Sequence, residues 1–279
     1  MGDEGTTGFR RDFQLFWPQE PQSRNTELVG EKAAYLSRLG HVFGVPRGFS
    51  VTALSYHDLP APDRDAVLNA AVAAYRELSR DAGLAVAVRP SPPPGMTRRR
   101  PPAFLNIRGH EALSSAVTEL LAWPMPSRGW APGLPGHAIG GLGRRALLIQ
   151  DLVAAESYAR VYLADTASPD SDIIVRATWG LGENLAKESE PADVFVFDTG
   201  LRLLSYQVAV KERMIALAAG GVTEVAVMNG LRLRPSLSET LSRRMARQLQ
   251  RAQQLLGRSV RLGMAVVGDE ISTVSCRPS

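Results

Sequence analysis

The sequence has little cysteine and no long apolar run, and both shortages exclude classes of protein. Cys276 is the one cysteine among 279 residues, so no internal disulfide forms, and a single thiol is typical of a reducing compartment. No apolar run reaches the roughly 18 residues that a membrane-spanning helix needs, and the N-terminus has no signal-peptide pattern. We therefore expect a cytoplasmic protein with no membrane partner.

Strong charge of either sign is also missing. The net charge is +4 with a pI near 9.5. This mild positive excess suits an anionic small-molecule ligand and does not by itself indicate nucleic acid, so we expect no nucleic-acid partner. A hydrophobic content of 44% is enough for a substantial core, and the length fits one large domain of two lobes.

The segment 27–50 carries the most distinctive local pattern. A Val-Gly-Glu-Lys turn at 29–32 precedes a helix whose Ala33, Leu36 and Leu39 share one face, and a Pro-containing loop then leads into a strand. A glycine and a lysine at a helix start place a cation beside free backbone N–H groups, where anions bind well. An ordinary surface turn is the alternative, because short motifs recur by chance.

Alternation and helical spacing predict the other elements. The first residues of the chain lead into a strand that ends before residue 26. Residues 124–143 are rich in glycine and proline, which is typical of a segment that crosses the protein surface. Ser238 is a suitable N-cap for the last helix. Helices are predicted at 63–79, 111–123 and from Ser238 on, and strands at 84–88, 146–150, 157–163, 172–175, 193–198, 208–213, 260–267 and 270–274.

Three further short motifs follow the segment 27–50 along the chain. Residues 103–107 read Ala-Phe-Leu-Asn-Ile, residues 177–183 read Ala-Thr-Trp-Gly-Leu-Gly-Glu, and residues 275–278 read Ser-Cys-Arg-Pro. Together with 27–50, they resemble the nucleotide-binding domain of phosphoenolpyruvate synthase and pyruvate phosphate dikinase, a family that includes rifampin phosphotransferase-like proteins. Its members read Leu-Val-Gly-Gly-Lys-Gly-Ala-Asn-Leu, then Ala-x-Trp-Gly-Leu-Gly-Glu, and later Gln-x-Arg-Pro.

The resemblance implies an α/β fold of the two-lobed ATP-grasp type, in which the lobes grip a nucleotide between them. It divides the chain into an N-terminal extension (1–26), an N-terminal lobe (27–145) and a C-terminal lobe (146–279). In the family, the strand matching 146–150 leads to the hinge that holds adenine, and the terminal hairpin holds the magnesium-bound phosphates.

The chain departs from the family where phosphates and metal are held. Where the family has a small-residue loop after Val-Arg, this chain has prolines within 90–94 and the triplet Arg98–Arg100. Proline lacks an N–H donor and cannot cradle phosphate. The family's metal-binding Glu and Gln fall on Gly263 and Ser275, with Arg261 near the preceding acidic residue, and Mg²⁺ wants carboxylate oxygens. We therefore expect no metal site, and both ATP and Mg²⁺ lost as cofactors.

The retained residues suggest an anion site. We expect Arg89 and Arg277 to orient an anionic small molecule and Lys32 to supply a charge or a proton, with Glu183 or Glu31 as acid or base. The alternatives are that these two glutamates only pair with the cations and that Trp179 packs between the lobes. The candidate catalytic residues are Lys32, Arg89 and Glu183, and the candidate ligand-binding residues are Gln150, Trp179, Arg277 and Glu31.

Three functions remain open from the sequence. The first is a repurposed enzyme that acts on an anionic metabolite without ATP or metal, such as a tailoring step in specialised metabolism. The second is a non-catalytic pseudoenzyme that binds a protein partner. The third is an ATP-dependent phosphotransferase half that works with a separate phosphohistidine protein, since none of the four histidines, His41, His57, His110 and His137, lies in a phosphohistidine motif.

Overall fold

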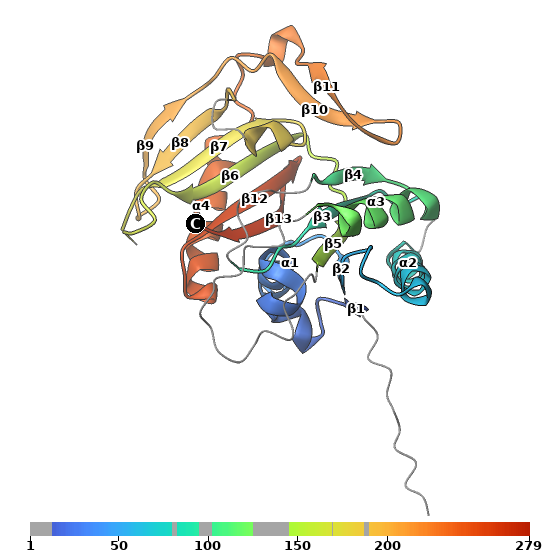
Figure 1. Ribbon diagram of the computed structural model, residues 1–279. Coiled ribbons are helices and arrows are strands. Elements are labelled where there is room, and N and C mark those ends of the chain that lie inside the picture. The colour runs from blue at the N-terminus through green and yellow to red at the C-terminus, as the bar shows by residue number, and fades with distance from the viewer. Residues whose placement is uncertain (1–12, 80–82, 95–101, 125–144, 169, 187–189) are drawn as a thin grey trace, which may run out of the picture.

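Two large antiparallel sheets with their covering helices and a small two-stranded sheet make up the computed structural model (Figure 1). It describes residues 13–79, 83–94, 102–124, 145–168, 170–186 and 190–279. The helices are α1 (Thr26–Leu39), α2 (Ala61–Leu78), α3 (His110–Ala122) and α4 (Glu239–Leu256), with short 3₁₀ turns η1 (Pro21–Arg24), η2 (Glu183–Ala186) and η3 (Asn229–Leu231). The predicted crossing at 124–143 and the triplet Arg98–Arg100 lie outside the described residues, apart from Pro124.

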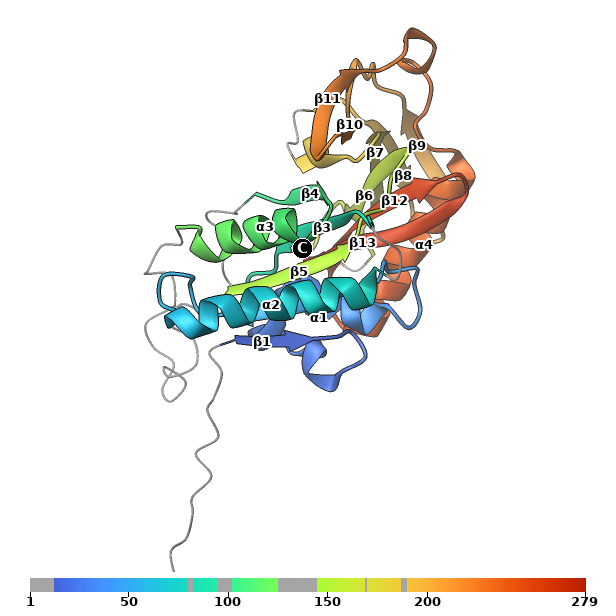
Figure 2. The ribbon, with the colours of Figure 1, turned by 90° about the vertical axis from the view of Figure 1, so that its right-hand side faces the viewer.

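The first sheet has five strands, and two helices pack on it. Its spatial order is β1 (Phe13–Phe16), β2 (Gly48–Ala53), β5 (Arg145–Asp151), β3 (Val86–Pro90) and β4 (Phe104–Ile107). α2 and α3 lie side by side along this lobe in both views (Figures 1 and 2). Their apolar faces, including Val67, Leu78 and Leu113, share a core with Phe49 and Ile149 of the sheet. Burial of such faces drives packing of amphipathic helices onto sheets.

The second sheet has six strands and is backed by α4 and α1. Its order is β13 (Glu270–Pro278), β12 (Val260–Val267), β6 (Ser157–Leu163), β7 (Ile173–Trp179), β8 (Asp193–Phe197) and β9 (Leu203–Gln207). Alternate residues such as Val161, Val175 and Phe195 share a core with Leu249 of α4 and Leu36 of α1. The N-terminal helix α1 therefore packs against the C-terminal sheet, and the core that they share also includes Phe16 and Leu148 of the first sheet.

Most predicted elements are observed, with three corrections. The predicted lobe boundary between residues 145 and 146 falls inside β5, which pairs with β2 and β3, so the sheets divide between Asp151 and Ser157. β1 pairs with β2 and is part of the first sheet. The predicted strand at 208–213 is wrong: β9 ends at Gln207 and the next strand begins at Arg213.

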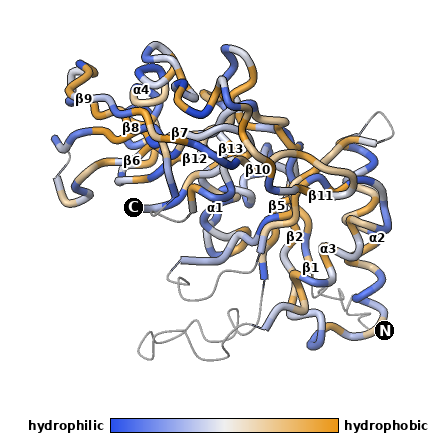
Figure 3. Tube along the Cα trace, turned by 90° about the horizontal axis from the view of Figure 1, so that it is seen from above, coloured by the Kyte–Doolittle hydropathy of each residue, from blue (hydrophilic) through white to orange (hydrophobic). Residues whose placement is uncertain are grey.

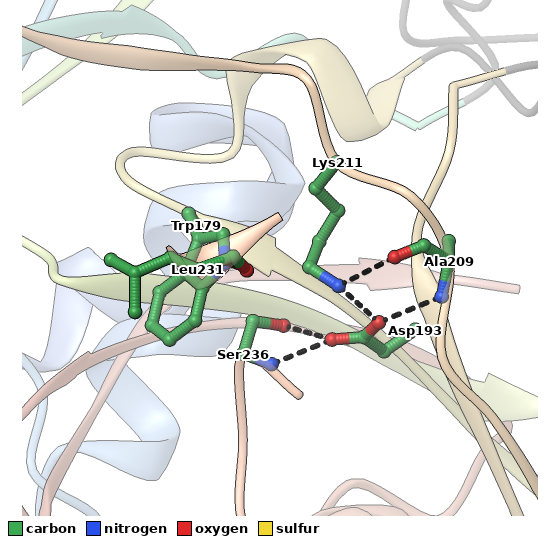
Figure 4. A network of polar contacts seen from close by, with 6 residues as sticks. All are labelled: Trp179, Asp193, Ala209, Lys211, Leu231 and Ser236. Atoms are coloured by element: carbon green, nitrogen blue, oxygen red, sulfur yellow. Dashed lines mark hydrogen bonds and ion pairs between the residues drawn. The ribbon is translucent and has the colours of Figure 1, made fainter. Parts of the chain in front are cut away.

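The break after Gln207 has a physical cause in a buried ion pair. Lys211 Nζ lies 2.5 Å from Asp193 Oδ1, and both side chains are fully buried. The same carboxylate accepts hydrogen bonds from the N–H of Ala209 and from the N–H and Oγ of Ser236 (Figure 4). A buried ion pair needs such satisfied partners, so the chain turns around Asp193 instead of continuing as a strand.

A two-stranded arm leaves the second lobe and reaches the first. β10 (Arg213–Ala218) and β11 (Gly221–Ala226) form a hairpin that lies over β4 in both ribbon views. The buried Asn106 of β4 donates through Nδ2 to the carbonyls of Ala218 (2.7 Å) and Gly221 (3.0 Å) at the hairpin tip. The arm therefore bridges the two lobes. No helix among the described residues is both long and apolar enough to span a bilayer.

Candidate functional site

The start of α1 is where the sequence suggested an anion site, and the chain itself occupies it. The helix is interrupted at Gly30, whose φ of 76° and ψ of 166° are not helical. The N–H of Glu31 donates to the Pro92 carbonyl (3.0 Å), and the N–H of Ala33 donates to Ser91 Oγ (3.0 Å). The interpretation that this turn offers free donors to an anion is therefore wrong for these two groups.

The fit between the turn and the segment 90–92 is close. A Cβ atom on Gly30 would lie 1.6 Å from the Ser91 carbonyl oxygen, so only glycine fits there. Ser91 is fully buried and its N–H donates to the Ala146 carbonyl. Lys32 is buried as well, and its Nζ donates to the Pro90 carbonyl at 3.1 Å. The proline segment thus uses its carbonyl groups where a phosphate loop would present N–H donors.

At the opposite side of the site, Tyr158 fills the space beside Gly263, the position at which the resemblance predicts a metal-binding glutamate in other family members. Its hydroxyl oxygen lies 2.1 Å from where a Cβ on Gly263 would stand, and its ring carbons lie 2.2–2.3 Å from a Cβ on Gly182. Gly263 faces Ser275 across the β12–β13 pair. The two glycines therefore leave room for one tyrosine from β6, and no longer side chain fits at 263 while Tyr158 keeps this position.

Positive charges surround Tyr158. Burial raises the pKa of its hydroxyl, and the charges of Arg89, Arg160 and Arg277 oppose this shift, whereas Glu183 adds to it. The hydroxyl therefore stays protonated at neutral pH and can donate a hydrogen bond. Three guanidinium groups and the Glu183 carboxylate act on this hydroxyl, so the charges that act on it are mainly positive and favour an anion.

A small cavity lies beside this cluster. Its volume is about 10 Å³, which is room for about one water molecule. Polar groups come from Arg89, Asp151 and Tyr158, and the rest of the lining is largely apolar, with Leu105 and Leu181 among the residues. Burial raises the pKa of Asp151, opposed by Arg47 at 3.0 Å, and its buried Oδ1 has no hydrogen-bond partner in the described part of the chain.

The predicted site residues are distributed around this region in different ways. Arg89 lines the cavity and also donates to the Val274 carbonyl at 3.0 Å. Arg277 lies close enough to act electrostatically on both Tyr158 and Glu31. Burial raises the pKa of Glu31, opposed by Arg258 and Arg277. Glu183 opens η2 with an exposed side chain.

Two predicted ligand-binding residues make structural contacts instead of lining the cavity. Gln150 is buried and donates through Nε2 to the Pro46 carbonyl at 3.2 Å. The next residues, 151–153, line the cavity in its place. Trp179 donates through Nε1 to the Leu231 carbonyl at 3.1 Å (Figure 4), so the polar edge of its indole contacts the segment that follows the arm. Packing of Trp179 between the lobes stays a prediction.

The residues present do not fit a magnesium–nucleotide complex. Gly263 and Ser275 supply no carboxylate, and Tyr158 fills the space between them and η2. No group of three or more His, Cys, Asp or Glu residues within the described ranges could hold a metal ion. Two N–H donors at the start of α1 are already used. The arrangement therefore supports no step of chemistry through Mg²⁺ or ATP.

Several residues that the fold brings together around the cavity carry no recognisable motif in the sequence. Tyr158 and Arg160 alternate with buried residues on β6, a pattern that marks them as facing away from the α4 core but does not reveal their partners. Asp151 directly follows Gln150, and no motif marks it as a lining residue. Asn106 is in the left-handed region with φ of 59°, a rare conformation for a non-glycine residue, and only the folded structure reveals it.

Comparison with known proteins places the chain in a family. Residues 59–279 match the family described as "Pyruvate phosphate dikinase, AMP/ATP-binding domain". Rifampicin phosphotransferase from Streptomyces sviceus is 26% identical over 93% of this chain and 35% of its own length. A probable phosphoenolpyruvate synthase from Methanothermobacter thermautotrophicus is 24% identical over 63% of this chain and 26% of its own length. The chain thus spans about a third or less of these relatives.

Solved structures are more distant. D-alanine–D-alanine ligase from Bacillus anthracis has a TM-score of 0.39 and 12% identity, covering 88% of this chain and 55% of that chain. VanG D-Ala:D-Ser ligase from Enterococcus faecalis has a TM-score of 0.40 and 12% identity, covering 90% and 52%. The family match covers well over half of the chain and agrees with the two facing α/β lobes of an ATP-grasp-like fold. The chain therefore belongs to the pyruvate phosphate dikinase AMP/ATP-binding domain family.

Proposed function

We propose that this chain is a family member that has exchanged Mg²⁺·ATP for an anionic small molecule, and that it acts on this molecule enzymatically without nucleotide or metal. The observation that carries the proposal is the cluster around Tyr158. There, a tyrosine hydroxyl lies against Gly263, where the resemblance predicts a carboxylate, and the retained guanidinium groups of Arg89 and Arg277 act on this hydroxyl.

The chemistry of the cluster defines the class of ligand. Guanidinium groups bind carboxylate and phosphate oxygens with paired hydrogen bonds. A protonated tyrosine beside them donates to an anion or to an enolate oxygen. Glu183, with an exposed side chain near this hydroxyl, is the candidate acid or base. A carboxylate, enolate or phosphate-bearing metabolite is therefore the proposed substrate class.

Access to the cluster requires the lobes or the arm to move. The cavity of about 10 Å³ is far smaller than the several hundred Å³ of an ordinary small-molecule site. Leu181 and Leu105, which line the cavity, pack in one cluster with Ile215 of the arm. We propose that the described arrangement is a closed state and that displacement of the β10–β11 arm opens the site.

Thermal-shift and calorimetric titrations test the proposal. The probes are phosphoenolpyruvate, inorganic phosphate, pyrophosphate and Mg²⁺·ATP. We expect at least one metal-free anion to stabilise the wild type at millimolar concentration and Arg89→Ala to remove the effect. Arg247→Ala, an exposed arginine on α4, is the matched control and should behave as wild type. Circular dichroism checks that each variant is folded.

Other outcomes select the competing functions. The closed cavity favours a second candidate, a non-catalytic module that binds a protein partner. It takes first place if no anion stabilises the wild type. Saturable, Mg²⁺-dependent ATP binding in the low micromolar range would instead favour an ATP-dependent phosphotransferase half, in keeping with the names of the relatives.

A further inference from the structure

The face of the second sheet that points away from α4 is rich in arginine. Side chains alternate between the two faces of a strand, and Leu262 and Met264 of β12 belong to the core that α4 shares. The residues between them therefore lie on the other face, where Tyr158 lies against Gly263 and Ala265 lines the cavity. Strand pairing places four arginines on this same face: Arg277 of β13, Arg261 of β12, Arg160 of β6 and Arg176 of β7.

These arginines form two rows in which like charges stand directly opposite each other. Arg261 pairs with Arg277 across β12 and β13, and we call these two residues the outer pair. Arg160 pairs with Arg176 across β6 and β7, and these two are the inner pair. In Figures 1 and 3, β12 and β13 lie between β6 and strand β5 of the first sheet. Like charges at opposite positions of an antiparallel pair destabilise a sheet, so each pair needs a compensating partner.

The inner pair has such partners within the chain, and Arg261 of the outer pair does not. Arg160 donates to the Leu185 carbonyl at 2.7 Å, and Arg176 donates to the Glu190 carbonyl at 2.9 Å. Arg261 is exposed, and its side chain forms no ion pair or hydrogen bond with the described residues. The outer pair is therefore the place where an anion from solution can relieve the repulsion.

The carboxylate of Glu31 does not supply this compensation, because it is already balanced. Arg258 and Arg277 both oppose the rise in the pKa of Glu31 that burial causes. Arg258 also donates to the Tyr35 hydroxyl at 2.8 Å. With the charge of Glu31 offset by these two groups, the charge of Arg261 favours an anion at the exposed end of this face.

We propose that the outer pair, Arg261 and Arg277, is a second anion subsite and that the substrate carries two anionic groups. The inference rests on the proposed function: one group binds at Arg89 and Tyr158, and the other binds at the outer pair. Arg261 and Gly263 are two residues apart on one strand, or about 6.7 Å, and the Tyr158 hydroxyl lies against Gly263. The substrate class is therefore a small molecule with an anionic group at each end of a short chain.

The outer subsite is open in the described arrangement, unlike the cavity of about 10 Å³. Arg261 is exposed and Arg277 is partly exposed. Guanidinium groups bind phosphate and carboxylate oxygens directly, so no metal ion is needed between them. One anionic group can therefore bind at the outer pair before the arm moves, which holds the second group near the entrance to the cavity.

Calorimetry in metal-free buffer tests the inference with two matched probes. Propylphosphonate has one anionic group, and propylene diphosphonate carries a phosphonate at each end of the same chain. We expect the wild type to bind the diphosphonate at least about tenfold more tightly. Arg261→Ala should remove this difference and leave the affinity for propylphosphonate unchanged. Arg247→Ala, which removes the same charge from the exposed side of α4, is the control and should keep the difference.

A measurement without any ligand tests the repulsion itself. Arg261→Glu turns the like-charge outer pair into an opposite-charge pair, so we expect the unfolding temperature in anion-free buffer to rise by about 1–3 °C. The same variant should bind both phosphonates with equal affinity. Arg234→Glu, an exposed arginine before α4, changes the net charge by the same amount and should not reproduce the rise. A lower unfolding temperature in Arg261→Glu would show that Arg261 has a structural role and would overturn the inference.

The binding results separate this inference from the proposed function. If the wild type binds both phosphonates equally and Arg89→Ala removes both, the proposed function stands and the second subsite is wrong. If the diphosphonate still binds tightly in Arg89→Ala but not in Arg261→Ala, the two groups do not span both subsites, which contradicts the inference and the proposed site together. If neither phosphonate binds the wild type, the inference is also overturned.

Discussion

The two ends of the interlobe site have departed from the family pattern in different ways. At the start of α1 the motif residues Gly30 and Lys32 are retained, but the segment 90–92 of the same chain accepts the hydrogen bonds there. At the β12–β13 hairpin the resemblance predicts that the motif residues themselves are replaced, and Tyr158 fills the space beside Gly263. A retained motif residue therefore does not imply a retained ligand site, because its donors can acquire partners within the chain.

The difference also separates two structural demands on glycine. Gly30 is required because of backbone geometry and a backbone neighbour, both of which are rigid. Gly263 is required because of a side chain that another substitution can remove. Variants at the two positions should therefore differ in size of effect and in whether a second substitution rescues them.

The largest effect is expected at Gly30. Gly30→Ala places a Cβ 1.6 Å from the Ser91 carbonyl oxygen at a φ of 76°, so we expect a loss of about 3–5 kcal/mol in unfolding free energy, or no folding at all. Gly257→Ala is the control, since its φ is 65° with nothing within 4 Å, and it should cost about 1 kcal/mol. Chemical denaturation measures both, and equal losses would show that backbone conformation alone decides the effect.

The second effect is expected at Gly263, with partial rescue. Gly263→Ala brings a Cβ within 2.1 Å of the Tyr158 hydroxyl and should cost about 1–3 kcal/mol by overpacking. In a Tyr158→Ala background the same change should cost clearly less, because only the Ser275 Cβ at 3.1 Å remains close. A double-mutant cycle by urea denaturation measures the coupling free energy between positions 158 and 263. Additive losses of unfolding free energy would contradict the close contact of Tyr158 with position 263.

Asn106 should have a smaller and local effect. Asn106→Gly keeps the left-handed backbone free of strain but removes both donors to the hairpin tip, at a cost of about 1–2 kcal/mol. Hydrogen exchange should accelerate in residues 213–226, while α4 at 239–256 serves as the internal reference. Unchanged exchange in the arm would mean that packing of Ile215 against Leu181, and not Asn106, holds it closed.

The smallest effect is expected from adding nucleotide. Because the start of α1 and the hairpin both lack an open phosphate or metal site, Mg²⁺·ATP at sub-millimolar concentration should leave the unfolding temperature of the wild type unchanged and give no saturable heat. The Gly263→Ala variant in the Tyr158→Ala background has more room but still no carboxylate, so its unfolding temperature should also stay unchanged and it should give no saturable heat. Saturable binding in either protein would contradict the lack of an open metal and phosphate site at the hairpin.

Alkaline pH offers a further test of the Tyr158 environment. Its folded-state pKa is raised above the usual value by burial, so the unfolded chain loses the proton first. Its contribution to stability is therefore complete below about pH 10, the ordinary tyrosine pKa, and is lost as the pH rises through the folded value. Tyr158→Phe should flatten the decline of the unfolding free energy above about pH 10, and a decline as steep as in wild type would assign it to other groups.

Local patterns predicted much of the fold because they depend on nearby residues. The N-cap Ser238, whose Oγ accepts from the Leu241 N–H, and the alternating burial of β6 to β8 follow from capping and two-residue periodicity. The strand expected at 208–213 failed because its lysine is buried against an aspartate that lies 18 residues earlier. No local pattern reveals that pairing.

The family could be read from the sequence, and so could the expectation that phosphate and metal groups are missing at 90–94, 263 and 275, because each depends on the identity of residues within an ordered motif. Only the tertiary structure decided what replaced the lost groups. Tyr158 reaches Gly263 through strand pairing between β6 and β12, and Pro92 reaches Glu31 from a distant part of the chain. Asn106 holds a hairpin more than 100 residues later. These contacts depend on how the sheets close against each other, and that closure arises from the packing of the whole chain.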